Sequence, residues 1–598
     1  MYERFNLLDG SHPWRAAVPD GYVDYPARVR GGGRVVYFNF DLAREMELVP
    51  ANHAPRLTAG LEKAILETFC LQIINEFDQQ SGEAFPAKLV KSKPFMATRY
   101  LQAQHRDKRG ICSGDGRSIW NGFIKTARLT YDVSSRGTGA TRLSPGAAIA
   151  DGPVKTGDGT WGYCCGTADL DEMLGTALMS EIFHRNGLPT ERTLTVIDFG
   201  DGNSIGVRVS ENLIRPAHVF RFLKQGRRAE TKSAMDYLIG RQVENRRWKL
   251  PAEETKRYRR VLRNIARTYG KLAADLEEEY IFNWLAWDGD NILAHGAILD
   301  YGSIRQFAAK HDKYRFDDVD RFSSTLTEQR FWARELVKVF AQAMHFIRTG
   351  RKLNLRQFKN ARCLKDFDRA FEEQREWRTL WRLGFSPQQI ERLRKTGRSE
   401  IDDLRRALSF FEEQKIARGM EKLPDGITHK PIFLIRNLLR KLPGFYVNEC
   451  GGKFGALMEP EEFCKAMAAS YASRRDMKLT AARAALAKNF QKCYQRLIAA
   501  AGPYEQVLRQ VAERSAVINF EQRITGDAIV GAVVELIEAK DRVSRADFQS
   551  AMDRFVESQV LIPGEWRPIE ADELENGSAR SRLLRAMLRQ LEECKETV

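Results

Sequence analysis

The residues with the clearest chemical meaning lie in one short stretch, Asp290-Asn291 followed by Asp300-Tyr301-Gly302. The sequence predicts that a tight hairpin, Ile292–Ala294 with Ala297–Leu299, separates the two acidic groups. Oxygens of Asn291 and Asp300 on adjacent loops suit a hard divalent cation that also binds phosphate. Asp290 is then free to orient or deprotonate an attacking hydroxyl. This order of loops is typical of kinase active sites, whereas the alternative is two unrelated turns, because Asp-Gly-Asp-Asn is also common in turns.

Cationic and glycine-rich segments earlier in the chain could bind phosphate. Ser113-Gly114-Asp115-Gly116-Arg117 precedes a predicted strand, and Arg136-Gly137-Thr138-Gly139 forms a second small-residue turn. Glycines allow a phosphate to approach the backbone, and arginine adds a bidentate donor. Arg208 and Arg215, seven residues apart, could clamp a polyphosphate from adjoining segments. Taken singly, each of these is more often an ordinary turn or a surface arginine.

The elements that must position these residues change character along the chain. Between residues 93 and 210, short β-like runs alternate with glycine-rich turns around a single helix, 170–186. The predicted strands are Ser118–Ile124, Leu129–Val133, Leu194–Phe199 and Ser204–Val209. After residue 216 the pattern is mostly helical, with one long amphipathic helix predicted over Glu253–Trp284. A β-rich part that carries the cations thus precedes a helical part that carries the Asp-Asn and Asp-Tyr-Gly pair.

These patterns predict an α+β protein with a β-rich N-lobe, a helical C-lobe and an additional helical C-terminal region. Four segments are expected: an N-terminal extension 1–92, an N-lobe 93–216, a C-lobe 217–440 and a C-terminal region 441–598. Residues 1–33 are expected to be irregular. They precede a strand over Val35–Phe40, a short helix over Leu42–Leu48 and helical spacing over Leu57–Phe77.

Composition limits the classes of protein that fit. The chain has 598 residues, and 95 Lys and Arg against 79 Asp and Glu give a net charge of +16, which favours anionic ligands. Its nine cysteines are scattered without a Cys-x-x-Cys pair, which argues against a disulfide framework and a zinc site. No apolar run approaches the roughly 20 residues that span a bilayer. The N-terminus lacks the layout of a signal peptide, so we expect a cytoplasmic protein.

The motifs together resemble those of the selenoprotein O (YdiU-type) family, collinearly over residues 33–310. Gly114-Asp115-Gly116-Arg117 matches the family's G-D-G-R motif, and Asp290-Asn291 with Asp300-Tyr301-Gly302 fits its D-N…D-Y-G block. Ser180–Arg192 is similar to the family's S-E-A-M-H…G-I-P-T-T-R segment, and Arg208 and Arg215 fit the ends of R-V-A-P-S-H-x-R. Members of the family have a protein-kinase-like fold and act as protein adenylyltransferases.

The resemblance implies a role for each matched residue. It implies that ATP binds flipped relative to ordinary kinases, so that its α-phosphate faces a Ser, Thr or Tyr hydroxyl of a protein or peptide. Asp290 would be the catalytic base, and Asn291 and Asp300 would hold Mg²⁺ or Mn²⁺. The expected ATP-binding residues are Gly114, Gly116, Arg117, Arg136, Gly166, Arg208, Arg215 and Asp300, with Arg208 and Arg215 on the outer phosphates.

Three departures from the family pattern affect the nucleotide site. Arg136 stands where the family has a phosphate-binding Lys, and Thr176 stands where the helix Glu that pairs with this Lys is expected. Asp171, Glu172 or Glu181 could replace that Glu. A second G-D-G-R motif falls near Cys164-Cys165-Gly166-Thr167, where only Gly166 is retained, after about twenty extra residues, 144–163.

We therefore expect a metal-dependent nucleotidyltransferase that moves AMP to a protein or peptide hydroxyl, with UTP as a possible variant substrate. The altered cation pocket keeps open a pseudokinase or nucleotide-binding module without turnover. A phosphotransferase that moves the γ-phosphate is a third alternative. Nucleic-acid binding, suggested by the net charge alone, is a minor one.

Overall fold

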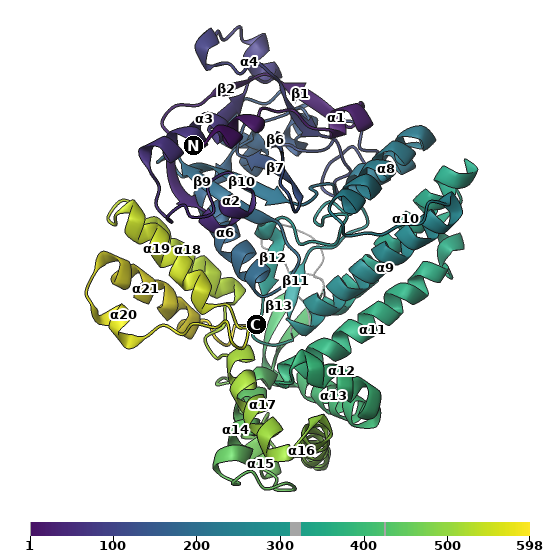
Figure 1. Cartoon of the computed structure of the whole chain (residues 1–598), viewed down its shortest axis with the longest axis vertical. Helices are drawn as coiled ribbons and strands as arrows, with labels where there is room; N and C mark the ends of the chain where they lie inside the picture. Colours follow the sequence, from purple (N-terminus) through teal and green to yellow (C-terminus); the bar gives the residue numbers. More distant parts are fainter. Residues whose placement is uncertain (1, 311–324, 424–425, 598) are drawn as a thin grey trace.

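The computed structural model describes residues 2–310, 325–423 and 426–597, and an antiparallel sheet forms its N-terminal half (Figure 1). The strand order is β1-β5-β6-β7-β10-β9-β3, and β8 pairs with β10. The strands are β1 (Tyr22–Tyr25), β3 (Arg34–Phe38), β5 (Phe95–Thr98), β6 (Ser118–Lys125), β7 (Thr130–Arg136), β8 (Ala168–Asp169), β9 (Arg192–Asp198) and β10 (Asn203–Ser210). The sheet therefore includes strands from both sides of the boundary expected at residue 92.

The four strands predicted between residues 93 and 210 are confirmed, but the region contains a short helix, α5 (Pro145–Ala150), that was not predicted. The helix predicted over 170–186 is also present. The helix is α6 (Leu170–Arg185), and it packs against β9 and β10. Its end is followed by Gly187 with a φ of 77°, a left-handed conformation that glycine adopts without strain. The turn between β9 and β10 likewise contains Gly200 and Gly202 with positive φ. The fold is α+β, as expected.

The N-terminal residues are more regular than the sequence indicated. Instead of irregular chain, residues 22–25 form β1 at one edge of the sheet. The helix expected over Leu57–Phe77 ends at Phe69, as α3 (Ala59–Phe69). It ends because Leu71–Ile73 pairs as β4 with β2 (Ala27–Val29) and buries Leu71 and Ile73, and α4 (Glu76–Gln80) follows. Strand pairing thus overrides local helical spacing.

Helices dominate after residue 216. They begin with α7 (Pro216–Gln225), α8 (Arg228–Glu244), α9 (Glu254–Glu278), α10 (Leu326–Thr349) and α11 (Arg362–Arg382). In Figure 1, α9 lies between α10 and α11 and contacts both along its length. The predicted helix over Glu253–Trp284 ends six residues early, because Tyr280 has a φ of 55° and Ile281–Asn283 pairs as β11 with β12 (Ile304–Gln306).

The hairpin predicted between Asp290 and Asp300 forms only as a short bridged turn. Ile292 bridges Ile298, the Leu293 N–H donates to the Ala297 carbonyl at 3.0 Å, and Gly296 has a φ of 81°. Regular strands do not form because two backbone N–H groups of the turn bind other segments. The Ala294 N–H donates to the Ile214 carbonyl, and the Ile298 N–H donates to the Pro189 carbonyl. These bonds tie the turn to the segments before α7 and after α6.

The C-terminal part contributes to two hydrophobic cores. One core contains the end of α11 and continues to α17. The other, larger core joins α18, α19 and α21 to α6, the sheet and helices α7 to α11. The sequence missed a hairpin, β13 (Lys415–Leu423) with β14 (Gly426–Pro431). The remaining helices are α12 (Pro387–Thr396), α13 (Arg398–Glu412), α14 (Ile435–Asn448), α15 (Pro460–Ala466), α16 (Ala481–Ala501), α17 (Tyr504–Ile518), α18 (Gly526–Ala539), α19 (Arg545–Ser558), α20 (Ala571–Glu575) and α21 (Ala579–Glu593).

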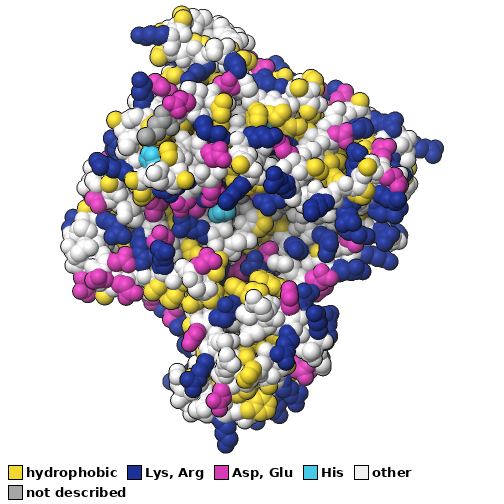
Figure 2. All heavy atoms as spheres, viewed as in Figure 1, with side chains coloured by type: hydrophobic (Ala, Val, Ile, Leu, Met, Phe, Trp, Pro, Cys, Tyr) yellow, Lys and Arg dark blue, Asp and Glu magenta, His cyan; other side chains and the backbone are white. Residues whose placement is uncertain are grey.

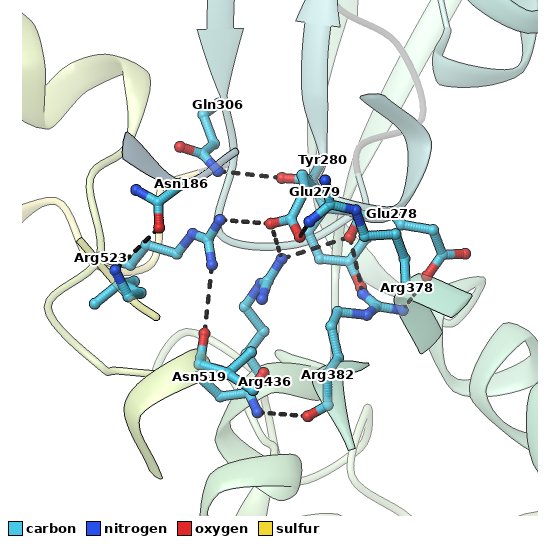
Figure 3. Close-up of polar contacts among 12 residues, drawn as sticks. Asn186, Glu278, Glu279, Tyr280, Gln306, Arg378, Arg382, Arg436, Asn519 and Arg523 are labelled. Atoms are coloured by element: carbon cyan, nitrogen blue, oxygen red, sulfur yellow. Dashed lines mark hydrogen bonds and ion pairs between the residues drawn. The ribbon is translucent and has the colours of Figure 1, made fainter. Parts of the chain in front are cut away.

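A buried ion network joins these parts at the end of α9 (Figure 3). Glu279 accepts from Arg436 of α14 at 2.8 Å and from Arg523 in the segment before α18. Glu278, one residue earlier, binds Arg382 of α11 at 2.6 Å. These arginines outweigh the cost of burial and lower the pKa of Glu279 to about 2. The network therefore fixes the base of β11, which leads directly into the loop that carries Asp290.

Candidate active site

A polar cleft of about 260 Å³ lies between the sheet and the loops that follow β11. It gathers residues that are widely separated in sequence, from β6, β7 and β10, from α6, and from the connection between β11 and β12. The predicted site residues that line it are Gly116, Arg117, Arg136, Arg208, Arg215, Asp290, Asn291 and Asp300. The structure thus brings eight of the ten predicted residues together.

Gly114 and Gly166 do not line the cleft, and each is required by packing. A Cβ at Gly114 would lie 2.1 Å from the carbonyl oxygen of Thr98, where residues 99 and 114 bridge. A Cβ at Gly166 would lie 1.9 Å from the backbone nitrogen of Ala140, and Gly166 has a φ of 86°. The two glycines therefore act by packing, because they let the loops that form the cleft lie close to residues 98 and 140.

Asp115 holds the first glycine-rich loop in place. Its carboxylate accepts from the Thr98 hydroxyl at 2.6 Å, from the Thr98 N–H at 2.9 Å and from the Trp120 indole at 3.0 Å. The Thr141 hydroxyl donates to the Asp115 carbonyl at 2.6 Å. The two predicted phosphate loops also touch, since the Gly137 N–H donates to the Arg117 carbonyl at 2.9 Å. The loops form one rigid floor.

Arg136 lies at the centre of this floor. Its main partner is Glu191, which was not predicted from the sequence. The Glu191 Oε1 atom lies 2.7 Å from Arg136 Nη2 and also accepts the backbone N–H of Asp300 at 3.0 Å. Glu191 is fully buried. Asp300 Oδ1 lies 3.5 Å from Arg136 Nη1, which has no hydrogen-bond partner among the described residues. The Glu191 carboxylate thus links Arg136 to the loop that carries Asp300, the predicted metal ligand.

Glu172 is the carboxylate of α6 that reaches the cleft. Of the three residues considered as replacements for the missing helix Glu, Glu172 lies 3.6 Å from Arg136 and holds Arg117 through two bonds of 2.7 and 2.8 Å. Glu181 instead binds Arg192 and Asn39, and Asp171 is exposed. Thr176 donates its hydroxyl to the Glu172 carbonyl. The carboxylate of α6 has therefore moved one turn toward the helix N-terminus.

Arg208 and Arg215 lie deep in the cleft with incomplete partners. Arg208 lies 3.8 Å from both Asp115 and Glu191, and its Nε atom is unpaired among the described residues. Burial and the neighbouring Arg136 lower the pKa of Arg208 to about 10, so it remains a cation at neutral pH. Arg215 lies over the Tyr100 ring and donates to the Asp290 carbonyl. Such under-neutralised cations suit a polyanionic ligand.

The two acidic residues of the predicted catalytic and metal loops differ in charge state. Burial, opposed by Arg215 and reinforced by Asp300, raises the pKa of Asp290 to about 6. Burial is outweighed at Asp300 by Arg136, Arg215, Arg117 and Arg208, which lower its pKa to about 2. Asp288 lies fully buried in the same loop, and burial and Asp290 raise its pKa well above the ordinary range. A permanent anion, Asp300, therefore faces a carboxyl group suited to accept a proton.

The donor set fits Mg²⁺ or Mn²⁺. Asn291 and Asp300 offer an amide and an ionised carboxylate to the same cleft, and the Asp290 Oδ1 atom has no partner among the described residues. Magnesium is commonly bound by one or two carboxylates together with substrate phosphates and water. Among the described residues, no cluster of three or more His, Cys, Asp or Glu side chains could hold a metal alone. Phosphate oxygens would complete the coordination.

Several further residues line the cleft. Tyr100, Gln102 and Trp284 lie beside the predicted residues, and Ser144 and Pro145 come from the extra segment 144–163. Ser144 caps α5 (Pro145–Ala150), and a Cβ at Gly116 would lie 2.8 Å from the Ser144 Cα atom. Ser144 followed by Pro145 is a typical helix start, and this pattern could have predicted α5 from the sequence. Glu191 carried no local signal, because its partners are distant in sequence.

Comparison with known proteins identifies the family of the chain. The family profile described as "Protein adenylyltransferase SelO" matches residues 45–553, most of the chain. The chain belongs to the SelO family. The profile thus extends well beyond the region 33–310 in which the motifs were matched, and includes most of the helices that surround the ion network.

Curated relatives of the SelO family protein are named "Protein nucleotidyltransferase YdiU". The protein from Lachnoclostridium phytofermentans is 28% identical over 217 residues, 35% of this chain and 40% of the relative. The protein from Halalkalibacterium halodurans is 27% identical over 287 residues, 46% of this chain and 52% of the relative. The chain therefore spans about half or less of the length of these relatives. In the described part of the chain, no helix is long and apolar enough to cross a membrane.

Proposed function

We propose that this SelO family protein transfers AMP from ATP to a hydroxyl group of a protein or peptide. We propose further that the sheet with α6 and the helices from α7 onward correspond to the two lobes of a kinase-like fold. The observation that carries the proposal is the composition of one cleft: four arginines, two oxygen ligands for a divalent cation, and a carboxyl group with a raised pKa. These are the groups that enzymes use to catalyse the transfer of phosphoryl and nucleotidyl groups.

The proposed reaction assigns the protein's residues to successive tasks. Arg208 and Arg215 bind the β- and γ-phosphates, and Arg117 and Arg136 neutralise charge near the α-phosphate. Asp290 accepts the proton of the acceptor hydroxyl, whose oxygen forms a bond to the α-phosphorus. The bond between the α-phosphorus and the bridging oxygen breaks, and pyrophosphate leaves. Mg²⁺ or Mn²⁺ on Asn291 and Asp300 supplies additional positive charge for the phosphates when it is bound.

The replacement of the family's Lys by Arg136 and of its helix Glu by Thr176 is compatible with nucleotidyl transfer. Arg136 is held by Glu191 at 2.7 Å and has Glu172 and Asp300 nearby, so a positioned cation remains although the Lys and the helix Glu are replaced. A guanidinium offers planar paired donors, unlike the point charge of lysine. We therefore keep UTP as an alternative nucleotide, because the altered cation changes the surroundings of the phosphates. The described cysteines are free thiols, and we propose a cytoplasmic setting.

The test is a parallel incubation with ATP labelled at the α- or the γ-phosphate, with Mg²⁺ or Mn²⁺, and with UTP as a second nucleotide. Self-modification and added candidate proteins are followed by gel and by intact mass. We expect label from the α-phosphate alone, and its loss in Asp300→Ala. Label from the γ-phosphate alone would identify a phosphotransferase. Nucleotide binding without transfer of either label to any protein would identify a nucleotide-binding module.

A further inference from the structure

The positive charge of the protein is concentrated in two segments that lie together. Residues 221–271 and 345–369 contain 24 Lys and Arg and 7 Asp and Glu, a net charge of +17 against +16 for the whole chain. They form the end of α7, α8, most of α9, the end of α10, the 3₁₀ helix η5 (Leu355–Phe358) and the start of α11. Figure 2 shows Lys and Arg side chains gathered over α9 and α10. The rest of the chain is close to neutral.

Two apolar hollows lie in this basic region, on either side of η5. The first, of about 230 Å³, is next to the active site and is lined by Leu223, Trp287, Trp332, Val339 and Leu355, and we call it the near hollow. The second, of about 270 Å³, is lined by Leu262, Met344, Phe358 and Ala361 between α9, α10 and α11, and we call it the far hollow. Leu355 and Phe358, at the two ends of η5, make the hollows neighbours.

The near hollow adjoins the catalytic cleft. Trp287 and Leu101 line the hollow, whereas their sequence neighbours Ala286 and Gln102 line the cleft. Trp287 is 37% exposed, and the Lys224 ammonium lies 4.6 Å from the centre of its ring. Lys352 donates to the Lys224 carbonyl at 3.0 Å, so two lysines border the same hollow. A chain that fills this hollow can therefore continue into the cleft.

Unpaired arginines surround the far hollow. Arg259, Arg348 and Arg362 are exposed lining residues, and none of them forms an ion pair within the described ranges 2–310, 325–423 and 426–597. Arg263, the fourth arginine there, is 3.8 Å from Asp366. Exposed cations around an apolar depression are complementary to a ligand that combines carboxylates with an apolar side chain.

We propose that η5 and the two hollows form a docking track for an acidic polypeptide segment of the acceptor protein. Two apolar side chains of that segment fill the near and far hollows, and its carboxylates pair with Arg259, Arg348 and Arg362. The segment runs along η5 and α10 toward the cleft, which delivers a neighbouring hydroxyl to Asp290. This inference rests on the proposed function, because it names the class of acceptor for that reaction.

A nucleic acid fits the track less well. Its phosphates would match the arginines, but the aromatic side chains of the far hollow do not form a platform on which bases stack. Tyr258 is buried, and His345 and Phe358 pack edge to face against each other. An acidic polypeptide supplies both the negative charge and the apolar side chains. A nucleic acid is therefore the alternative outcome that the experiment must distinguish.

The experiment measures binding by fluorescence anisotropy and uses the full-length protein. The probes are labelled peptides of Asp, Glu and Gly with two Phe residues at varied spacing, the same peptides with Ser in place of Phe, and oligothymidylate of equal charge. We expect the Phe peptides to bind best. We expect Arg259→Glu with Arg362→Glu, and separately Leu355→Ser, to weaken binding at least about tenfold, ~1.4 kcal/mol.

Lys488→Glu with Arg509→Glu is the control, because it changes the charge equally at two exposed residues of α16 and α17. This pair should leave binding unchanged. Equal affinity for the Phe and Ser peptides at every spacing, or no loss on reversing the arginines, would overturn the proposal. Tighter, arginine-dependent binding of oligothymidylate would replace it with nucleic-acid binding. AMP transfer without peptide binding rejects only the track, whereas peptide binding without nucleotide transfer in any assay rejects the proposed function.

Discussion

Arg136 and Glu191 form a buried ion pair of 2.7 Å, and the same Glu191 oxygen accepts the backbone N–H of Asp300 at 3.0 Å. Asp300 has a φ of 70° and a ψ of 73°, a left-handed conformation that costs energy in a residue other than glycine. The Oε1 atom of Glu191 therefore neutralises the charge of Arg136 and also stabilises the unfavourable backbone conformation of Asp300. The consequences of this arrangement can be measured separately from transfer.

Removing one partner of the Arg136–Glu191 pair should cost more stability than removing both. We expect Glu191→Gln to lower the free energy of unfolding by about 3 kcal/mol, because Arg136 is left buried without its main counter-charge. Arg136→Met with Glu191→Gln should recover part of this loss. Urea unfolding of the two single variants and the double variant measures the coupling, and additive effects would show that the pair is not coupled.

Asp300→Ala should abolish the dependence of ATP affinity on Mg²⁺, because it removes the ionised ligand of the proposed cation site. Calorimetric titration with ATP, with and without Mg²⁺, measures this directly. Asp171→Ala is the matched control, since Asp171 is an exposed carboxylate of α6 outside the cleft. Retention of the full Mg²⁺ effect in Asp300→Ala would exclude Asp300 as a metal ligand.

Asp290→Asn should separate binding from chemistry. The amide preserves the shape of the side chain but cannot accept the acceptor proton, so we expect transfer to fall by about 10²–10⁴-fold. ATP affinity should change little. Initial rates with α-labelled ATP and a parallel binding titration test this pair of expectations. An equal loss of binding and transfer would indicate that Asp290 acts through the structure of its loop.

Arg523→Ala should destabilise the protein far more than an exposed arginine on a nearby helix. Glu279 is 5% exposed and would lose one of its buried counter-charges, at a cost of about 3 kcal/mol. Arg509→Ala on α17 is the control. Chemical unfolding measures both variants. A loss of equal size in the two would show that the ion network contributes nothing specific.

Stability should also depend on Asp553 of α19, which packs against α6 and β3. Burial raises its pKa to about 7, with Gln549 and Arg185 opposing and Asp41 and Glu557 reinforcing the shift. The folded state thus binds this proton more tightly than the unfolded state, and the contribution is lost as the pH rises through about 7.

Asp553→Asn should remove that dependence. The difference in melting temperature between variant and wild type should grow in favour of the variant from pH 5 to about pH 7 and then level off, because in this range only the wild type releases a proton when it unfolds. Melting scans across this range, at constant ionic strength, provide the measurement. A difference that stays constant with pH would mean that Asp553 has an ordinary pKa.

Local patterns predicted the parts of the site that lie within one segment. The spacing of Asp290, Asn291 and Asp300, together with Gly116 and the four arginine positions, led to eight residues that line one cleft. Glu191 was missed because its role depends on Arg136 and Asp300, which are 55 and 109 residues away. Long-range ion pairs leave no periodicity in the sequence from which they could be predicted.

The same distinction holds for the fold. The helix α6, which is followed by Gly187 in the sequence, was predicted with nearly correct ends. Errors occurred where pairing with a distant strand decided the structure: Leu71–Ile73 pairs with β2, and Ile281–Asn283 pairs with β12. Both segments continue a helical pattern locally, so only the tertiary contact distinguishes strand from helix.

The network around Glu279 also has a consequence for synthesis. The ribosome makes Glu279 early, but its partners Arg378, Arg436 and Arg523 emerge in that order over the following 244 residues. A nascent chain shorter than about residue 523 cannot complete the anchorage of β11 and of the loop that follows it. The anchorage is therefore complete only after residue 523 has been made, so products truncated before that residue would lack the ordered loop that the proposed reaction needs.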